Sequence, residues 1–174
     1  LEGNKSFVDK FNLVRKDRLS YSYLGFNMRK EKLKDVRVRK AIAHAIDRDQ
    51  INKTISNGEG TLANTFVHAV QTKFINTDIK PVTYDVEMAK TLLTEAGWAD
   101  TDGDGFLDKN KQKFNLDIKM PSGNDIAKQQ ALMYKEQLRK VGIDLNIVER
   151  EWTVYLQEMD KFDFELNMGG WTIP

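Results

Sequence analysis

The chain has 174 residues, with 27 Lys and Arg against 26 Asp and Glu, and 40% of its residues are hydrophobic. That length and composition suit one domain with a sizeable core and exclude a disordered or collagen-like chain. The net charge of +1 lacks the basic excess of a dedicated nucleic-acid binder, and no apolar run approaches the ~20 residues that span a bilayer. The absence of cysteine excludes disulfides, thiolate metal sites and cysteine nucleophiles.

The first third of the chain is predicted to form two strands and then two helices. Phe11–Arg15 and Ser20–Met28 show the aromatic and β-branched enrichment of strands. Asp35 and Asp47 are candidate N-caps of two successive helices, and Asn57-Gly58 is expected to end the second. The buried face of the first helix is predicted to contain Val38, Ala41, Ile42, Ala45 and Ile46.

The middle of the chain contains two segments without a regular hydrophobic period. Residues 59–83 are expected to form a long irregular excursion, and residues 99–113 an acidic, Gly-rich loop. Between them, Asp85 predicts the start of a helix and Gly97 its end at a left-handed position. The buried face of this helix is predicted to contain Ala89, Leu92, Leu93 and Ala96.

Strands and helices alternate clearly from Phe114 onward. Strands are predicted at Phe114–Met120, Ile143–Val148 and Phe162–Met168, separated by helices at Asn124–Val141 and Trp152–Met159. This alternation implies right-handed crossovers and a parallel core, so the predicted fold class is α/β. The first two of these strands should therefore be parallel neighbours in one sheet.

The acidic loop follows the pattern of a calcium-binding loop over its first nine positions. Oxygen-bearing side chains fall at positions 1, 3, 5 and 9, and glycine falls at position 6. The bidentate Glu that closes such a loop at position 12 is missing, because Lys111 stands there. A structural acidic turn and a weak calcium site therefore both remain open. The candidate metal ligands are Asp100, Asp102, Asp104 and Asp108.

Four sequence blocks, taken in order, point to a family. The most specific runs from Tyr23-Leu24-Gly25-Phe26-Asn27-Met28 to Ala45-Ile46-Asp47-Arg48. The others are Glu95-Ala96-Gly97-Trp98, Asp102-Gly103-Asp104-Gly105 and the segment from Gln137 to Trp171. Together they resemble the bacterial extracellular solute-binding proteins of family 5, the oligopeptide- and dipeptide-binding components of ABC importers.

The resemblance implies a fold of two lobes that close like a clamshell, of the class II periplasmic-binding-protein type. Residues 1–174 are then a single α/β lobe, with a mixed sheet and flanking helices, from a larger protein. This lobe corresponds to most of the more C-terminal of the two. By the same resemblance, a peptide binds between the lobes and is delivered to a membrane permease for import.

The same resemblance gives the expected surroundings of the protein. It implies an extracellular or periplasmic location, with the complete protein tethered to the membrane as a lipoprotein and acting as a monomer. Its partners are a peptide ligand and ABC permease subunits, and no nucleic acid. No cofactor is required, and calcium is the one candidate metal.

An enzyme is the first rival to this prediction, and the sequence argues against it. It contains no nucleophile elbow, no phosphate-cradling glycine motif and no histidine dyad. The alternative that we retain is a calcium-dependent extracellular interaction module, which would use the acidic loop.

The resemblance also proposes ligand-binding residues. Family members place aromatic pocket walls at the positions that match Trp152 and Trp171, and core packing is the alternative for each. Gly169 and Gly170 would let a peptide backbone approach closely, unless they only form a bend. Met168 stands where well-known members carry an arginine, and residues 172–174 contain no aspartate of the kind that holds a free peptide amino group in some members. Such an aspartate either follows further along the complete protein or is missing from this subgroup.

Three polar positions complete the set of candidates. Ser122 and Asn124 follow a predicted strand and precede a helix N-terminus, whose free N–H groups suit an anion or a carbonyl. Helix capping by either residue is the alternative. His44 is interpreted as a packed or surface histidine, and Asp47-Arg48 as a helix junction fixed by capping and an ion pair.

Overall fold

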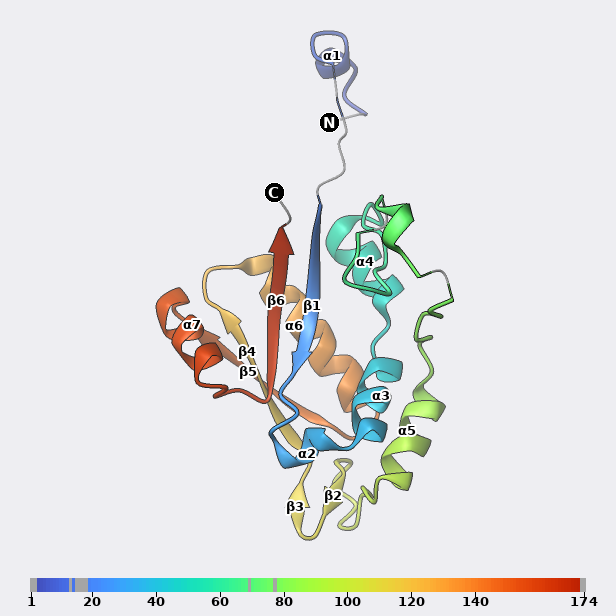
Figure 1. Ribbon diagram of the computed structural model, residues 1–174, viewed down its shortest axis with the longest axis vertical. Coiled ribbons are helices and arrows are strands. Elements are labelled where there is room, and N and C mark those ends of the chain that lie inside the picture. The colour runs from blue at the N-terminus through green and yellow to red at the C-terminus, as the bar shows by residue number, and fades with distance from the viewer. Residues whose placement is uncertain (1–2, 13, 15–18, 69, 77, 173–174) are drawn as a thin grey trace.

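The computed structural model describes residues 3–12, 14, 19–68, 70–76 and 78–172 of the chain. Its centre is a four-stranded mixed sheet in the order β1-β6-β4-β5 (Figure 1). β6 is parallel to β4 and antiparallel to β1, and β4 is parallel to β5. The strands are β1 (Ser20–Phe26), β4 (Asn115–Pro121), β5 (Asp144–Arg150) and β6 (Leu166–Thr172).

Helices flank both faces of this sheet, and α3 packs extensively against α5 (Figure 1). None of the described helices is both long enough and apolar enough to cross a membrane. The helices are α1 (Lys5–Val8), α2 (Glu31–Lys34), α3 (Val36–Ala45), α4 (Arg48–Ser56), η1 (Thr72–Phe74), α5 (Val86–Glu95), α6 (Asp125–Arg139) and α7 (Trp152–Asp160). A short separate hairpin is formed by β2 (Asp108–Lys109) and β3 (Gln112–Lys113).

The predicted parallel core is confirmed. β4 and β5 pair in parallel from Asn115↔Asp144 to Pro121↔Arg150, and α6 connects them. Along β4, Leu116, Ile118 and Met120 are completely buried because alternate side chains point to the same face. The α/β class and the mixed sheet with flanking helices are therefore correct.

The prediction for the last strand was wrong about where the strand starts. β6 begins at Leu166 rather than Phe162, because α7 ends in a turn that uses the intervening residues. Phe162 has φ +56°, and the next amide, of Asp163, donates to the carbonyl of Glu158 at 2.8 Å. The guanidinium of Arg29 lies 3.3 Å from the centre of the Phe162 ring and covers this turn.

The predicted first strand, Phe11–Arg15, is only partly covered by the described residues. Residues 13 and 15 lie outside them, and residues 11, 12 and 14 do not belong to a strand. The described helix closest to this segment is α1. The second predicted strand is present as β1 and ends at Phe26 instead of Met28.

The predicted helix N-caps are confirmed by hydrogen bonds. The side chains of Asp35, Asp47 and Asp85 accept from the backbone N–H groups of Arg37, Gln50 and Met88. The Arg37 guanidinium also hydrogen-bonds Asp35 and lowers the pKa of that carboxyl to about 2.

The junction between α3 and α4 uses a partner that the sequence did not suggest. The buried side chain of Gln137, from α6, accepts from the Asp47 N–H at 3.0 Å and donates to Gln50 at 3.0 Å. A distant glutamine therefore accepts from the backbone N–H of the N-cap residue, as the side chain of the third helical residue does in a capping box. The Asp47–Arg48 ion pair is absent from the contacts of the described residues, and Arg48 reaches residues 63, 64 and 82 instead.

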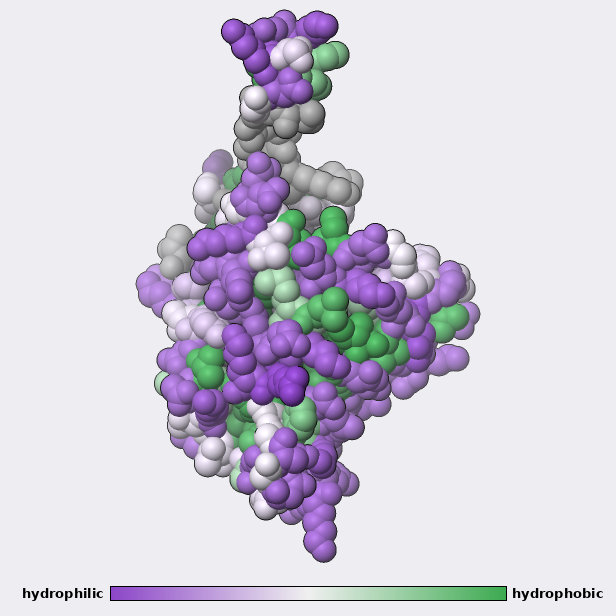
Figure 2. All heavy atoms as spheres, turned by 180° about the vertical axis from the view of Figure 1, so that it is seen from behind, coloured by the Kyte–Doolittle hydropathy of each residue, from purple (hydrophilic) through white to green (hydrophobic). Residues whose placement is uncertain are grey.

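The hydrophobic core lies between the sheet and the layer of α3, α5 and α6. Trp98 closes one end of it by stacking on Phe114, with ring centroids 4.1 Å apart. Seen from behind, where α6 faces the viewer, the surface carries apolar patches within a largely hydrophilic covering (Figure 2). The exposed apolar side chains of α6 are Ile126 and Leu132.

Candidate ligand-binding site

The carboxyl ends of the three parallel strands meet at one edge of the sheet. β4, β5 and β6 end at Pro121, Arg150 and Thr172. The predicted binding residue Ser122 directly follows the first end, Trp152 lies two residues after the second, and Trp171 lies one residue before the third. Open α/β sheets form their ligand crevices at such an edge. Figure 1 shows it at the end to which the β6 arrow points.

The last part of β6 extends beyond its neighbour β4. β4 pairs with β6 only at Ile118↔Leu166 and Lys119↔Asn167, whereas β1 pairs with β6 along its entire length. Residues 168–171 therefore form a two-stranded ribbon with β1, and no described strand pairs with their other edge. An open strand edge of this kind can bind an extended peptide through main-chain hydrogen bonds.

One face of this ribbon is aromatic. The cross-strand register pairs Tyr21 with Trp171 and Tyr23 with Gly169, and alternate residues share a face. A Cβ atom on Gly169 would lie only 2.5 Å from Tyr23 Oη, so the missing side chain makes room for that ring. Gly170 lies on the other face, where a Cβ atom would lie 3.0 Å from the Tyr21 carbonyl oxygen.

Trp152 is attached to the same ribbon through Tyr155. Its indole is 56% exposed and stacks on the Tyr155 ring, with centroids 5.8 Å apart. The buried Tyr155 hydroxyl donates to the Met168 carbonyl at 2.6 Å and accepts from the Asn167 side-chain amide at 3.2 Å. Burial raises the pKa of Tyr155, which keeps this hydroxyl protonated as a donor.

The two predicted tryptophans differ from Met168 in their exposure. Trp171 is 62% exposed and Trp152 is similar, so neither indole is a core residue. The Met168 side chain is 8% exposed and belongs to the core cluster. Only the backbone of Met168 therefore lies at the edge of β6, because its thioether packs in the core.

An ionic network centred on the buried Lys119 holds α7 against the sheet beside these residues. Lys119, which is 7% exposed, lies 3.1 Å from a Glu158 oxygen, and Arg150 binds the other Glu158 oxygen at 3.0 Å. Burial opposes ionisation of Glu158, but the hydrogen bond from Arg150 and the positive charge of Lys119 prevail and lower its pKa. Lys119 also binds Asp163, after the end of α7. This network fixes the helix that carries Trp152.

Ser122 and Asn124 lie in the loop that leads from β4 into α6. The Asn124 side chain accepts from the Ala127 N–H at 3.0 Å, so it caps the helix as the alternative interpretation stated. The Ser122 amide donates to the Arg150 carbonyl at 2.7 Å. Both side chains are exposed at the carboxyl edge of the sheet.

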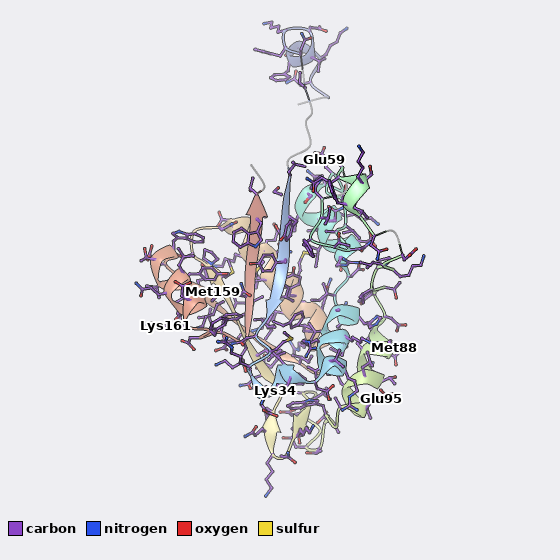
Figure 3. All side chains as sticks on the ribbon, in the orientation of Figure 1. Lys34, Glu59, Met88, Glu95, Met159 and Lys161 are labelled. Atoms are coloured by element: carbon purple, nitrogen blue, oxygen red, sulfur yellow. The ribbon has the colours of Figure 1, made fainter. Side chains whose placement is uncertain are left out.

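A cavity of about 1010 Å³ opens between β1, α4, α6 and residues 59–82. Its lining is largely uncharged and includes Leu24, Ile51, Ile126 and Tyr134. A shallower depression of about 550 Å³ adjoins it and brings Trp171 next to residues 63–66. Figure 1 shows this part of residues 59–83 in green, beside the start of β1, and Glu59 is labelled there in Figure 3.

The acidic loop lies at the opposite end of the molecule, next to the β2–β3 hairpin (Figure 1). One oxygen each of Asp100, Asp102 and Asp108 lies within 4.8 Å of the others. The fourth predicted ligand, Asp104, hydrogen-bonds Lys113 instead, which lowers the pKa of Asp104. The structure therefore separates the candidate metal ligands from the candidate peptide-binding residues.

Three residues at the carboxyl edge were missed by sequence reasoning. Tyr23, Tyr155 and Asn167 connect β1, α7 and β6, and their pairing depends on contacts far apart in the sequence. The signal available for Tyr23 was its alternation with Tyr21 in a predicted strand. The sequence offered no comparable signal for Tyr155 or Asn167.

The chain and its fold are similar to those of known proteins. Residues 2–174 match the model of the bacterial extracellular solute-binding proteins, family 5 Middle. The oligopeptide-binding protein AppA of Bacillus subtilis is 34% identical over 172 residues, which cover 95% of this chain and 32% of AppA. Its structure in complex with a nonapeptide superposes with a TM-score of 0.87, covering 97% of this chain and 34% of that one.

Other relatives differ in the ligand that they are named for. The dipeptide-binding protein of Escherichia coli is 34% identical over 165 residues, 92% of this chain and 28% of that protein. Heme-binding protein A of Haemophilus influenzae is 28% identical over 163 residues, 94% of this chain and 28% of that protein. The chain thus spans about a third of the length of these relatives. All three are named as binding proteins, and the matches lend no support to a calcium-dependent interaction module.

Proposed function

Because the chain belongs to the bacterial extracellular solute-binding proteins of family 5, we propose that it serves in the substrate-binding component of an ABC importer. In this proposal residues 1–174 form most of one of two lobes, and a peptide binds between the lobes before delivery to a membrane permease. The family is extracellular or periplasmic. The proposal adds a lipoprotein anchor in the complete protein, a monomeric state and no catalytic step.

The observation that supports a peptide as the ligand is the open edge of β6 between two exposed tryptophans. Residues 168–171 present backbone groups that no described strand pairs with, and Trp171 and Trp152 are both more than half exposed. A peptide main chain can add to such an edge without regard to its sequence, while aromatic surfaces accept varied side chains. The edge therefore suits a peptide of unspecified sequence.

Each predicted residue has a proposed role. Gly170 supplies main-chain contacts at the edge, next to Met168, whose carbonyl already accepts from the Tyr155 hydroxyl, and Gly169 leaves room for the Tyr23 ring. Trp171 and Trp152 form aromatic walls. Ser122 and Asn124 bound the same crevice at the carboxyl edge, one strand away.

The test uses the complete natural protein and a series of peptides. Trp171→Ala should weaken peptide binding about tenfold or more, because it removes a large apolar contact area. Contacts between aromatic rings add roughly 0.5–1.5 kcal/mol beyond the area that they bury. Trp171→Phe should retain most of the affinity. Tyr84→Ala, which removes an exposed aromatic ring just before α5, is the matched control and should change nothing.

Mass spectrometry of what co-purifies with the complete protein identifies the ligand class directly. A peptide in the purified sample supports the proposal. A heme or a metal chelate in its place, with no binding of any peptide, would contradict it. Unchanged affinity in Trp171→Ala would reject this tryptophan as part of the site.

A calcium ion is a second, separate candidate ligand, and no cofactor is otherwise proposed. The observation in its favour is the convergence of Asp100, Asp102 and Asp108 on one point. Such an ion would stabilise the loop at the far end of the lobe rather than take part in peptide binding.

A further inference from the structure

The excursion of residues 59–83 forms one wall of the large cavity but has little structure of its own. The short helix η1 is its only described regular element, and its described internal contacts are local, such as Val67 N–H to Thr65 Oγ1 at 3.2 Å. A segment of this length needs hydrogen-bond partners from elsewhere if it is to keep one conformation.

Those partners are three side chains spaced four residues apart, from the end of α3 to the middle of α4. The Asn52 amide donates to the Gly60 carbonyl at 2.8 Å, and the His44 ring nitrogen Nδ1 lies 2.8 Å from the Thr83 carbonyl oxygen. The Arg48 guanidinium lies between them. The excursion is thus attached near both of its ends, at residues 60 and 83, to the same two helices.

Arg48 contacts both limbs of the excursion at once. Its Nη1 donates to the Ala63 carbonyl at 2.9 Å, and its Nη2 donates to the Val82 carbonyl at 3.3 Å. These three residues also line the cavity. The planar fork of a guanidinium can bridge two separate carbonyl oxygens in a fixed geometry, which a single ammonium group cannot do in the same way.

We propose that Arg48 is a positioning residue for ligand binding: it joins the two limbs of the excursion and so keeps this wall of the cavity in place. The part that concerns the ligand rests on the proposed peptide-binding function. The part that concerns the wall does not, so the two can be tested separately.

The first experiment needs no ligand. Lys73 lies in the excursion, is exposed and is followed by Phe74, so trypsin cleavage after it reports the opening of the excursion. In the complete natural protein, Arg48→Ala should raise the rate of this cleavage about tenfold, as expected when a charged hydrogen bond is lost. Arg48→Lys should lie between Arg48→Ala and the natural protein.

The matched control is Arg39, another half-buried arginine, which lies in α3. Its guanidinium also donates to two backbone carbonyls, of Leu33 at 2.8 Å and Lys34 at 2.7 Å, but it does not line the cavity. Arg39→Ala should leave cleavage after Lys73 unchanged. Equal cleavage in Arg48→Ala and Arg39→Ala would overturn the proposal.

The second experiment measures peptide affinity in the same variants. Arg48→Ala should weaken binding about tenfold, with partial recovery in Arg48→Lys and no effect of Arg39→Ala. If Arg48→Ala opens the excursion but peptide affinity stays the same, the proposed role in ligand binding is wrong. If the natural protein binds no peptide at all, the proposed function fails, while the cleavage experiment still decides whether Arg48 holds the wall.

Discussion

The two long irregular segments of the chain are held in different ways. The acidic loop supplies its own hydrogen-bond partners: the Asp100 carboxylate accepts from the N–H groups of Gly103 and Gly105, and Asp108 accepts from Thr101. The excursion of residues 59–83 instead depends on His44, Arg48 and Asn52 from α3 and α4. A loop of the first kind can keep its shape whatever surrounds it, whereas one of the second kind follows the helices that hold it.

The largest predicted effect comes from loosening those helices. Gln137 is 3% exposed and binds both Asp47 and Gln50 at the start of α4, so Gln137→Ala leaves the half-buried Asp47 N–H without its acceptor and leaves a gap where a buried side chain packed. We expect a loss of about 2–3 kcal/mol in the free energy of unfolding, measured by urea denaturation. Trypsin cleavage after Lys73 should accelerate, because α4 carries Arg48 and Asn52.

Gln130→Ala serves as the control on the same helix, since Gln130 hydrogen-bonds only Tyr134 among its described contacts. It should cost much less stability and leave the excursion closed. Proteolysis of the acidic loop should be unaffected by either substitution. If Gln137→Ala opened the acidic loop as readily as the excursion, the two segments would not be independent.

A substitution within the acidic loop should have the opposite pattern. Asp100→Ala removes the acceptor of two backbone N–H groups and should cost about 1–2 kcal/mol, less than a buried network because water can replace the lost partner. Hydrogen exchange of the Gly103 and Gly105 amides should accelerate, and peptide affinity should not change. Protection of both amides in Asp100→Ala would show that the carboxylate does not hold the loop.

The difference between partners close in the sequence and partners far apart in it also explains which features could be predicted from the sequence. Helix caps, the parallel β4–α6–β5 unit and the glycine stops depend on neighbours within a few residues, so spacing alone revealed them. The roles of Gln137 and Tyr155 depend on partners many residues away, and no local pattern encodes them.

The strand β6 lies between these extremes. Its existence was predictable from its apolar residues, but its start was not, because the buried Asn27 side chain donates to the carbonyls of Phe162 and Phe164 and holds that segment as a turn. The exposed tryptophans were suggested by a family resemblance rather than by the pattern of the residues. The cavity was not predictable, since residues 59–83 show no period from which their path could be inferred.

Calcium offers a milder way to separate the two segments. If an ion binds among Asp100, Asp102 and Asp108, calcium at about three times a millimolar Kd should stabilise the folded protein by about 0.8 kcal/mol. The melting temperature should rise with calcium and fall with chelator, and Asp102→Ala should abolish the rise. Trypsin cleavage in the excursion should not respond. An unchanged melting curve in millimolar calcium would leave the loop as a structural turn.

Acid should produce the smallest effect, and it should act on the acidic loop first. The hydrogen bond from Lys113 lowers the pKa of Asp104 below its usual 3.8, so this pair stabilises the folded protein fully above that pH. The contribution is lost as the pH falls through the lower, folded value, because the protonated carboxyl no longer pairs with Lys113. The bridge from Arg48 across the excursion should persist, because its acceptors at residues 63 and 82 are backbone carbonyls rather than carboxylates. An NMR titration of the Asp104 carboxyl carbon and the Phe106 amide, which donates to it, measures this directly. Lys113→Ala should move the Asp104 midpoint up toward 3.8. A midpoint already at or above that value in the natural protein would mean that Lys113 does not stabilise the loop.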